Sequence, residues 1–254
     1  MEKRIGFIGA GNMGGAIANT LVEKGYKEIK VSDKNPETWT NLKEKIETTT
    51  SNKYVVENSD IIILCVKPQH MDEVITEIKD YCKDKLVISI AAGKTLEYLE
   101  NNIGHSRVTT AMPFMGVMYG YGATGYVCGK GCSVEDQKTV YNLFEKIGAV
   151  SMIPKENMED MTAIASMPGW VIQYCDAMMG GLKLKKPFTK QCVAKVLRTC
   201  ADVLESEEEP NEFYKRIASA GGTTEAGYEH AKQKGLYKIA KEMVNAAIKR
   251  YREL

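Results

Sequence analysis

The sequence lacks an excess of charge of either sign. It contains 34 lysine and arginine residues and 33 aspartate and glutamate residues among its 254 residues, which gives a formal net charge of +1. Proteins that bind nucleic acid or an anionic membrane through charge carry clustered Lys and Arg. The composition therefore argues against both of these partners, and a small molecule together with a second copy of the chain is expected instead.

Long hydrophobic runs are also absent. The longest uncharged stretch, residues 108–129, approaches the length of a membrane span but is interrupted by Pro113 and five glycines. The first nine residues contain too few apolar side chains for a secretory signal. We therefore expect a protein of the cytoplasm, without a membrane-spanning helix.

Metal-binding patterns are lacking as well. The sequence has three isolated histidines and seven cysteines. Cys128 and Cys132 could form half of a metal site, but no second Cys or His pair lies at ligand spacing. We predict buried, reduced thiols and no metal site.

Residues 1–154 alternate short apolar runs with amphipathic stretches, which is typical of a parallel sheet covered by helices. The run 61–66 is apolar at every position and is expected to be a central strand. The other expected strands are 4–8, 29–32, 86–90, 107–111 and 126–128, and the expected helices are 13–24, 39–45, 71–81, 95–101 and 134–146.

After residue 154 the β-branched runs disappear. Helical patterns cover 156–184, 190–204, 211–218 and 225–252, the last with a break at Gly235. The predicted fold is an α/β N-terminal domain, residues 1–154, followed by an all-α C-terminal domain, residues 155–254.

A glycine-rich loop follows the first expected strand and opens the first expected helix. Its glycine spacing permits a tight turn at Gly9, close approach of a pyrophosphate at Gly11 and close packing of helix on strand at Gly14. The N–H groups of a helix N-terminus favour bound phosphate. The predicted dinucleotide-binding residues of this loop are Gly9, Ala10, Gly11, Asn12, Met13 and Gly14.

The end of the second expected strand carries Ser32, Asp33 and Lys34. A carboxylate at the position of Asp33 can accept hydrogen bonds from the adenosine ribose, which favours NAD. Lys34 could instead pair with the 2′-phosphate of NADP, and Asp33 could simply be a turn residue before Asn35. The cofactor is therefore predicted as NADP or NAD.

Several separated motifs together resemble one family, the pyrroline-5-carboxylate reductases. They lie in the order and at the spacing of that family and cover essentially the whole chain. The matching stretches are 5–14, 66–69, 88–93, 111–113 and 219–224.

The resemblance implies reduction of the cyclic imine 1-pyrroline-5-carboxylate to L-proline by the reduced form of the cofactor. It also implies a Rossmann-type domain and a helical dimerisation domain in a homodimer or a larger assembly of dimers. By position in the family, the residues bordering the nicotinamide half of the cofactor would be Val66, Lys67, Pro68, Ala91, Ala92, Gly93, Met112 and Pro113.

In the same family the segment matching Gly221, Gly222, Thr223 and Thr224 holds the substrate carboxylate, and Thr224 would be catalytic because its hydroxyl would lie near the imine nitrogen. Backbone N–H groups at a helix N-terminus suit a carboxylate. A threonine that merely caps the helix is the alternative interpretation.

The sequence departs from the family where the substrate should bind. Phe114 stands where the family usually has Asn, and Met167 stands where it usually has Gly. Both residues are predicted to line the substrate pocket, where they would add apolar bulk and remove hydrogen-bonding groups. A divergent relative with weak activity, no activity or a regulatory role is therefore the alternative function, and a β-hydroxyacid dehydrogenase is the third.

Overall fold

The computed structural model describes residues 3–254. The chain divides into two compact packing units: one comprises the residues up to Ser166 together with Ala247–Leu254, and the other comprises Met167–Ala246. We describe each unit by itself. The expected domain boundary after residue 154 stays a prediction.

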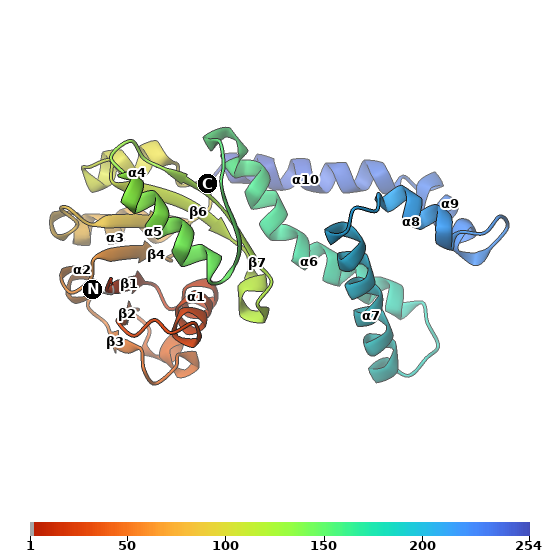
Figure 1. Ribbon diagram of the computed structural model, residues 1–254, viewed down its shortest axis with the longest axis horizontal. Coiled ribbons are helices and arrows are strands. Elements are labelled where there is room, and N and C mark those ends of the chain that lie inside the picture. Colours follow the sequence, from red (N-terminus) through yellow and green to blue (C-terminus); the bar gives the residue numbers. More distant parts are fainter. Residues whose placement is uncertain (1–2) are drawn as a thin grey trace. The chain divides into compact units, whose positions relative to one another are not determined.

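Within the described residues, eight strands of the first unit form one sheet in the order β3-β2-β1-β4-β5-β6-β7-β8 (Figure 1). Only the β6–β7 pair is antiparallel. The strands are β1 (Ile5–Ile8), β2 (Ile29–Ser32), β3 (Glu47–Thr49), β4 (Ile61–Leu64), β5 (Leu86–Ser89), β6 (Val108–Pro113), β7 (Gly122–Cys128) and β8 (Gly148–Met152).

Helices cover both faces of this sheet. They are α1 (Asn12–Glu23), α2 (Asn52–Glu57), α3 (Met71–Ile78), α4 (Leu96–Ile103) and α5 (Val134–Glu145). Five 3-10 turns accompany them in the described part of the chain: η1 (Pro36–Asn41), η2 (Pro68–His70), η3 (Lys79–Tyr81), η4 (Met115–Tyr119) and η5 (Lys155–Asn157).

The alternation of side chains along β4 explains the two layers. Ile63 belongs to a core cluster that includes residues of α1 and α5, whereas Ile62 and Leu64 belong to a second cluster with residues of α3 and α4. All four β4 residues are buried. The prediction of a central strand that is apolar on both faces is therefore confirmed.

Three short elements were not predicted, and one predicted helix is wrong. β3, β8 and α2 carry too little apolar periodicity to stand out in the sequence. The expected helix 39–45 is instead the 3-10 turn η1, whose start is fixed by Pro36 and by the Asn35 side chain, which accepts a hydrogen bond from the Glu37 N–H. The predicted parallel sheet is confirmed apart from the antiparallel pairing of β6 with β7.

The second unit is formed by helices alone. The helices of the C-terminal region are α6 (Met158–Gly180), α7 (Lys186–Glu205), α8 (Pro210–Ile217), α9 (Thr223–Gln233) and α10 (Leu236–Arg252). The predicted break at Gly235 is confirmed, because this glycine has a φ of +89° between α9 and α10. Among the described residues, no helix is long and apolar enough to cross a lipid bilayer.

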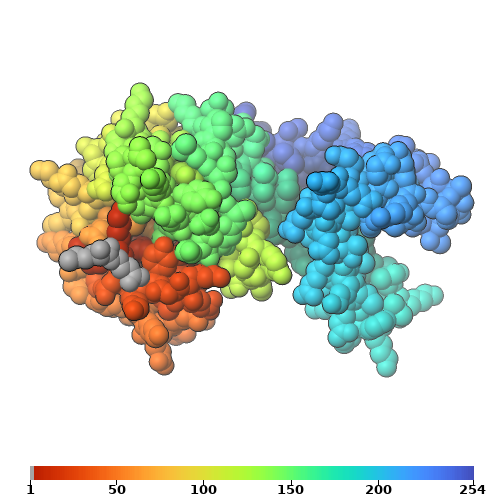
Figure 2. Space-filling model, in the orientation of Figure 1, coloured from red at the N-terminus to blue at the C-terminus, as the bar shows by residue number. Residues whose placement is uncertain are grey.

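Apolar side chains of the second unit are largely uncovered. Only Cys175 and Thr189 are buried within residues 167–246. Figure 2 draws the residues of this unit in cyan to blue. The exposed apolar side chains of the unit include Val171, Ile172, Tyr174, Met178, Leu182, Leu184, Phe188, Val196, Leu204, Ile217, Tyr237, Ile239 and Met243.

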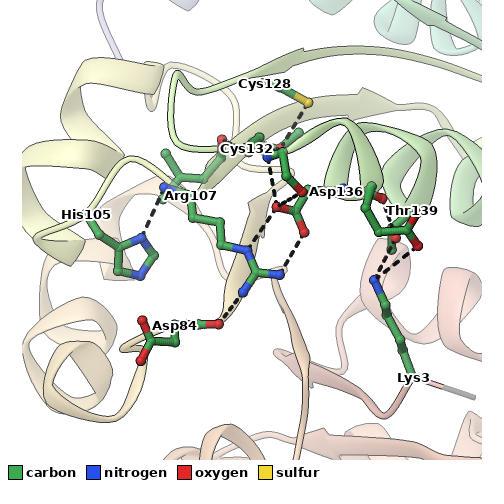
Figure 3. Close-up of polar contacts among 12 residues, drawn as sticks. Lys3, Asp84, His105, Arg107, Cys128, Cys132, Asp136 and Thr139 are labelled. Atoms are coloured by element: carbon green, nitrogen blue, oxygen red, sulfur yellow. Dashed lines mark hydrogen bonds and ion pairs between the residues drawn. The ribbon is translucent and has the colours of Figure 1, made fainter. Parts of the chain in front are cut away.

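An ion pair with a buried carboxylate joins the residue before β6 to the first turn of α5 in the first unit. Arg107 Nη2 lies 2.7 Å from Asp136 Oδ1 (Figure 3). The Ser133 side chain caps α5 by accepting a hydrogen bond from the Asp136 N–H, and the Asp136 carboxylate accepts hydrogen bonds from the N–H and the hydroxyl of Ser133. Burial acts to raise the pKa of Asp136, but hydrogen bonds from Arg107 and Ser133 outweigh it and lower the pKa to about 2. This cluster lies at the amino end of β6, away from the carboxyl ends of the parallel strands.

Candidate dinucleotide-binding site

The glycine-rich loop between β1 and α1 has the geometry that its spacing predicts. Gly9 adopts a φ of +105°, which favours glycine. A Cβ on Gly14 would lie 2.2 Å from the Gly9 carbonyl oxygen, so the helix packs directly on the loop. A Cβ on Gly11 would meet nothing within 4 Å. Gly11 therefore leaves open space in front of the first N–H groups of α1, where an anion can approach.

Asp33 fastens this loop to the end of β2. Its Oδ2 accepts a hydrogen bond of 2.8 Å from the Ala10 N–H, and its Oδ1 accepts one of 2.9 Å from the Asn35 N–H. Asp33 is thus a turn residue, as one interpretation of the sequence held. Each carboxylate oxygen retains a lone pair that can accept a ribose hydroxyl.

An open cavity of about 400 Å³ lies beside the loop. Such a volume is within the range of small-molecule sites. It brings together residues from β1, β2 and the end of β4 that were predicted to bind the cofactor: Gly9, Gly11, Ser32, Asp33, Lys34, Val66 and Lys67. The structure therefore brings predicted residues from both halves of the site to one cavity, from segments far apart in the sequence.

Seven residues of this cavity were not predicted: Ile8, Asn35, Asn52, Cys65, His70, Glu73 and Val74. Asn52 is the first residue of α2 and is buried. Its Oδ1 accepts a hydrogen bond of 2.7 Å from Ser32 Oγ, and its Nδ2 donates one of 2.8 Å to Glu77. The signal that could have revealed it is Ser51, whose side chain caps α2 at this point.

Glu73 and Lys34 form an ion pair at the same cavity. Lys34 Nζ lies 2.5 Å from Glu73 Oε1, and both side chains are exposed. The hydrogen bond to Glu73 raises the pKa of Lys34, and the same bond lowers the pKa of Glu73. The Lys34 ammonium group, which the sequence suggested as a partner for a 2′-phosphate, is therefore already paired with Glu73.

A second cavity of about 670 Å³ lies on the other side of the loop, over α1. Ala10, Gly11 and Asn12 line it together with Met115 and Met118 of η4. The remaining loop residue, Met13, packs against the core cluster beside α1. The loop thus has open space on two sides, as an extended ligand crossing it would need.

Of the residues predicted for the nicotinamide half, Val66 and Lys67 line the first cavity. The others lie outside that cavity, at or after the carboxyl ends of β4, β5 and β6. Pro68 starts η2, and Ala91, Ala92 and Gly93 follow β5. Met112 and Pro113 end β6 and are buried. Gly93 has a φ of +76°, and a Cβ there would lie 2.3 Å from Leu254 Cβ, so the last turn of the described chain packs on this loop.

Phe114 lies against its own loop. A Cβ on Gly116 would be 2.5 Å from Phe114 Cε2, so the ring covers the face of this glycine. The large side chain at position 114 is therefore accommodated by the missing side chain at position 116. The Phe114 ring thus packs against η4 at Gly116, which has no side chain to clash with it.

The Gly221–Thr224 segment precedes and begins α9 in the second unit. Gly221 has a φ of +69°, and its N–H donates to Glu225 Oε2 at 2.6 Å. The Gly222 N–H donates to the Ser219 carbonyl at 2.9 Å. The N–H groups of Gly221 and Gly222 are therefore already engaged within the protein. Of the four residues predicted to bind an anion, Thr223 and Thr224 remain as backbone N–H donors, and both are exposed in the first turn of α9. Met167 of α6 is also exposed.

No group of three or more His, Cys, Asp or Glu side chains is arranged for a metal ion within residues 3–254. Cys128 and Cys132 are free thiols. Thr109 Oγ1 lies 3.5 Å from Cys128 Sγ and 3.8 Å from Cys132 Sγ. The two thiols therefore share Thr109 as a polar neighbour.

A largely parallel sheet with a glycine loop at its carboxyl edge, an acidic residue directly after the next strand and an open cavity between them is typical of a dinucleotide-binding oxidoreductase fold. The family model "NADP oxidoreductase coenzyme F420-dependent" matches residues 4–93, and "Pyrroline-5-carboxylate reductase dimerisation" matches residues 155–254. The chain belongs to the pyrroline-5-carboxylate reductase family, an oxidoreductase family acting on CH–NH groups with NAD(P). The predicted fold class and the resemblance are confirmed.

Curated relatives match over nearly their full length. Pyrroline-5-carboxylate reductase 2 of Bacillus subtilis is 33% identical, with 89% of this chain and 85% of the relative covered. The Escherichia coli pyrroline-5-carboxylate reductase is 33% identical, with 92% of each covered.

Solved structures show the same fold. The Coxiella burnetii pyrroline-5-carboxylate reductase has a TM-score of 0.87 at 26% identity, covering 100% of this chain and 98% of that one. The Plasmodium falciparum pyrroline carboxylate reductase, solved with NADP bound, has a TM-score of 0.91 at 24% identity with the same coverage.

Proposed function

We propose that this protein reduces 1-pyrroline-5-carboxylate to L-proline with NAD(P)H, as a proline biosynthetic enzyme of the cytoplasm. The observation that carries the proposal is the glycine loop with its adjoining cavity, in a chain that matches the reductase family across both of its parts. The domain boundary after residue 154 is proposed on the same ground, because the dimerisation match starts at residue 155.

The residues at the loop fit a dinucleotide. The open face of Gly11 and the N–H groups at the start of α1 would bind the pyrophosphate, and Asp33 would accept the ribose hydroxyls. The cofactor supplies hydride for addition to the imine carbon. Val66, Lys67, Ala91 to Gly93, Met112 and Pro113 would border the nicotinamide half, since they follow or end strands at the same edge of the sheet.

Thr224 is proposed as the catalytic residue. Its side chain is exposed at the second position of α9 and is free to donate a proton to the imine nitrogen. The N–H groups of Thr223 and Thr224 at this helix N-terminus would bind the substrate carboxylate, and Gly221 and Gly222 would shape the turn that presents them. A general acid of this kind contributes about 100-fold or more to the rate.

We propose that the protein acts as a homodimer or as a larger assembly of dimers. The exposed apolar side chains of residues 167–246 supply the contact surface, and the matching dimerisation domain covers the same region. Met167 and Phe114 are proposed to contact the substrate.

The test is consumption of NADH or NADPH with racemic 1-pyrroline-5-carboxylate, followed by chiral identification of the product. We expect L-proline, and we expect Thr224→Val to lower kcat by about 100-fold while Thr224→Ser retains most of it. Cofactor binding without any turnover would overturn the assignment.

The departures at Phe114 and Met167 favour the alternative of a weakly active or regulatory relative that binds dinucleotide. The double variant Phe114→Asn with Met167→Gly separates the two functions. Raised turnover would support a reductase with a remodelled pocket. If the wild type and the double variant both bind cofactor without turnover, the regulatory alternative is favoured.

A further inference from the structure

The ion pair between Lys34 and Glu73 joins two distant elements at the first cavity. Lys34 follows Asp33 at the end of β2, and Glu73 lies in the first turn of α3, 39 residues along the chain. Both residues line the cavity of about 400 Å³ beside the glycine loop. The 2.5 Å contact therefore spans part of the wall of the cavity that we assign to adenosine.

The charges at this wall are unusual for a site that receives a phosphate. Lys34 and Lys67 line the cavity as cations, and the carboxylates of Asp33 and Glu73 line the same cavity. Asp33 is held in place by two backbone N–H groups. Glu73 binds the ammonium group of Lys34, the residue directly after Asp33. This ammonium group is the cation best placed in the sequence to contact a substituent on the ribose.

In this fold class the acidic residue after the second strand binds the ribose 2′-hydroxyl, and a nearby cation accommodates a 2′-phosphate. A bound 2′-phosphate would have to compete with Glu73 for Lys34 and would also be repelled by the Glu73 carboxylate. A 2′-hydroxyl is uncharged, so it neither needs Lys34 as a counter-ion nor is repelled by Glu73. The ion pair therefore penalises the phosphorylated cofactor selectively.

We propose that Glu73 is a specificity-determining residue, which makes the site select NADH over NADPH by holding Lys34 and by opposing a 2′-phosphate. The proposal rests on the proposed function, since it needs a dinucleotide in this cavity. Glu73 acts partly through Lys34, so its effect must depend on that lysine.

The test uses two adenosine fragments that need no catalysis: adenosine 5′-monophosphate and adenosine 2′,5′-bisphosphate. Their dissociation constants are measured by titration calorimetry for the wild type, Glu73→Gln, Lys34→Gln and the double variant. We expect Glu73→Gln to tighten the bisphosphate by roughly tenfold, from Coulomb energies of a dianion near one charge in a solvent-exposed site. We expect its affinity for the monophosphate to change by less than about twofold, because that fragment has no 2′-phosphate to be repelled.

The Lys34→Gln background separates the two contributions. There, removing Glu73 relieves only direct repulsion, so the gain for the bisphosphate should fall to about threefold or less. Asp72→Asn is the matched control: it removes a carboxylate one residue away that does not line the cavity. The ratio of kcat/KM for NADH over NADPH should fall in Glu73→Gln in parallel with the fragment affinities.

The proposal is overturned if the wild type binds the bisphosphate more tightly than the monophosphate, or if Glu73→Gln leaves the ratio of the two affinities unchanged. In both cases the proposed reductase function stands. If neither fragment nor dinucleotide binds the folded wild type, the proposed function itself fails, and that result is distinct from the first two.

Discussion

The two packing units of this chain differ in where their apolar side chains lie. The sheet unit buries large side chains completely, among them Phe7, Ile62 and Phe144. Residues 167–246 bury only Cys175 and Thr189 and leave a broad set of Leu, Ile, Val, Met and aromatic side chains exposed. Helices gain most of their stability by burying an apolar face. The sheet unit can obtain that burial within one chain, whereas the helical unit requires a second surface.

The largest effect is expected when one exposed valine of each unit is replaced by aspartate, which tests whether only the helical unit needs a partner surface. Val171 on α6 is 44% exposed and Val134 at the start of α5 is 68% exposed. In a symmetric dimer Val171→Asp would bury two unpaired carboxylates, so we expect the dimer dissociation constant to rise roughly 1000-fold. Analytical ultracentrifugation over a concentration series measures it.

Val134→Asp is the control, because an acidic residue in the first turn of a helix is favourable. We expect no change in its oligomeric state and little change in melting temperature. A dimer that survives Val171→Asp unchanged would show that α6 is not part of the contact surface.

A second experiment compares two glycines of the loop in the sheet unit: Gly14, expected to be needed for packing, and Gly11, expected to be needed for cofactor binding. In Gly14→Ala the new Cβ would meet the Gly9 carbonyl oxygen at 2.2 Å. We expect a loss of about 2 to 3 kcal/mol in the free energy of unfolding, from overpacking against backbone. Gly11→Ala meets nothing within 4 Å and should keep its stability while binding NADH at least tenfold more weakly. Urea unfolding and NADH titration check both, and equal stability of the two variants would contradict the packing role of Gly14.

The smallest effect expected concerns acid stability. The pKa of Asp136 is about 2 in the folded protein, below its ordinary value of 3.8, so its contribution to stability is present above pH 4 and is lost as the pH falls towards 2. We expect Asp136→Asn to remove about 2 kcal/mol at pH 7 and progressively less below pH 4.

Asp60→Asn provides the control for that experiment. Asp60 also pairs with an arginine, Arg4, but its side chain is 42% exposed, compared with 3% for Asp136. An exposed ion pair contributes less than about 1 kcal/mol. Urea unfolding between pH 2 and pH 7 measures both variants, and an equal loss in the two would refute the role given to burial.

Sequence reasoning located the parts of the fold that have strong local patterns. The strand Ile29–Ser32 was predicted with its observed bounds, and α1, α3 and α5 were predicted within a few residues. The glycine loop and Asp33 were recognisable because their chemistry is confined to consecutive residues. Short polar elements such as β3 and α2 were missed because three to six residues carry no usable periodicity.

The rest of the candidate site depends on tertiary contacts that a single sequence does not display. Asn52 enters the cavity only because α2 packs beside β2, and Glu73 reaches Lys34 only because α3 covers β4. The amide of Gly222 was expected to face a ligand, but it is consumed by a local turn with Ser219. Local patterns therefore gave the location of the cofactor loop, whereas the charges around it came from packing.

The pairing of Arg252 with Glu159 has a consequence for how the chain folds during synthesis. Two hydrogen bonds of 2.7 and 2.6 Å link these side chains across 93 residues, and the whole helical unit lies between them in the sequence. The ribosome must therefore release residues 167–246 before α10 can supply this contact. Until then the nascent sheet unit lacks the turn that packs on Gly93, so the loop after β5 is among the last parts of the molecule to be completed.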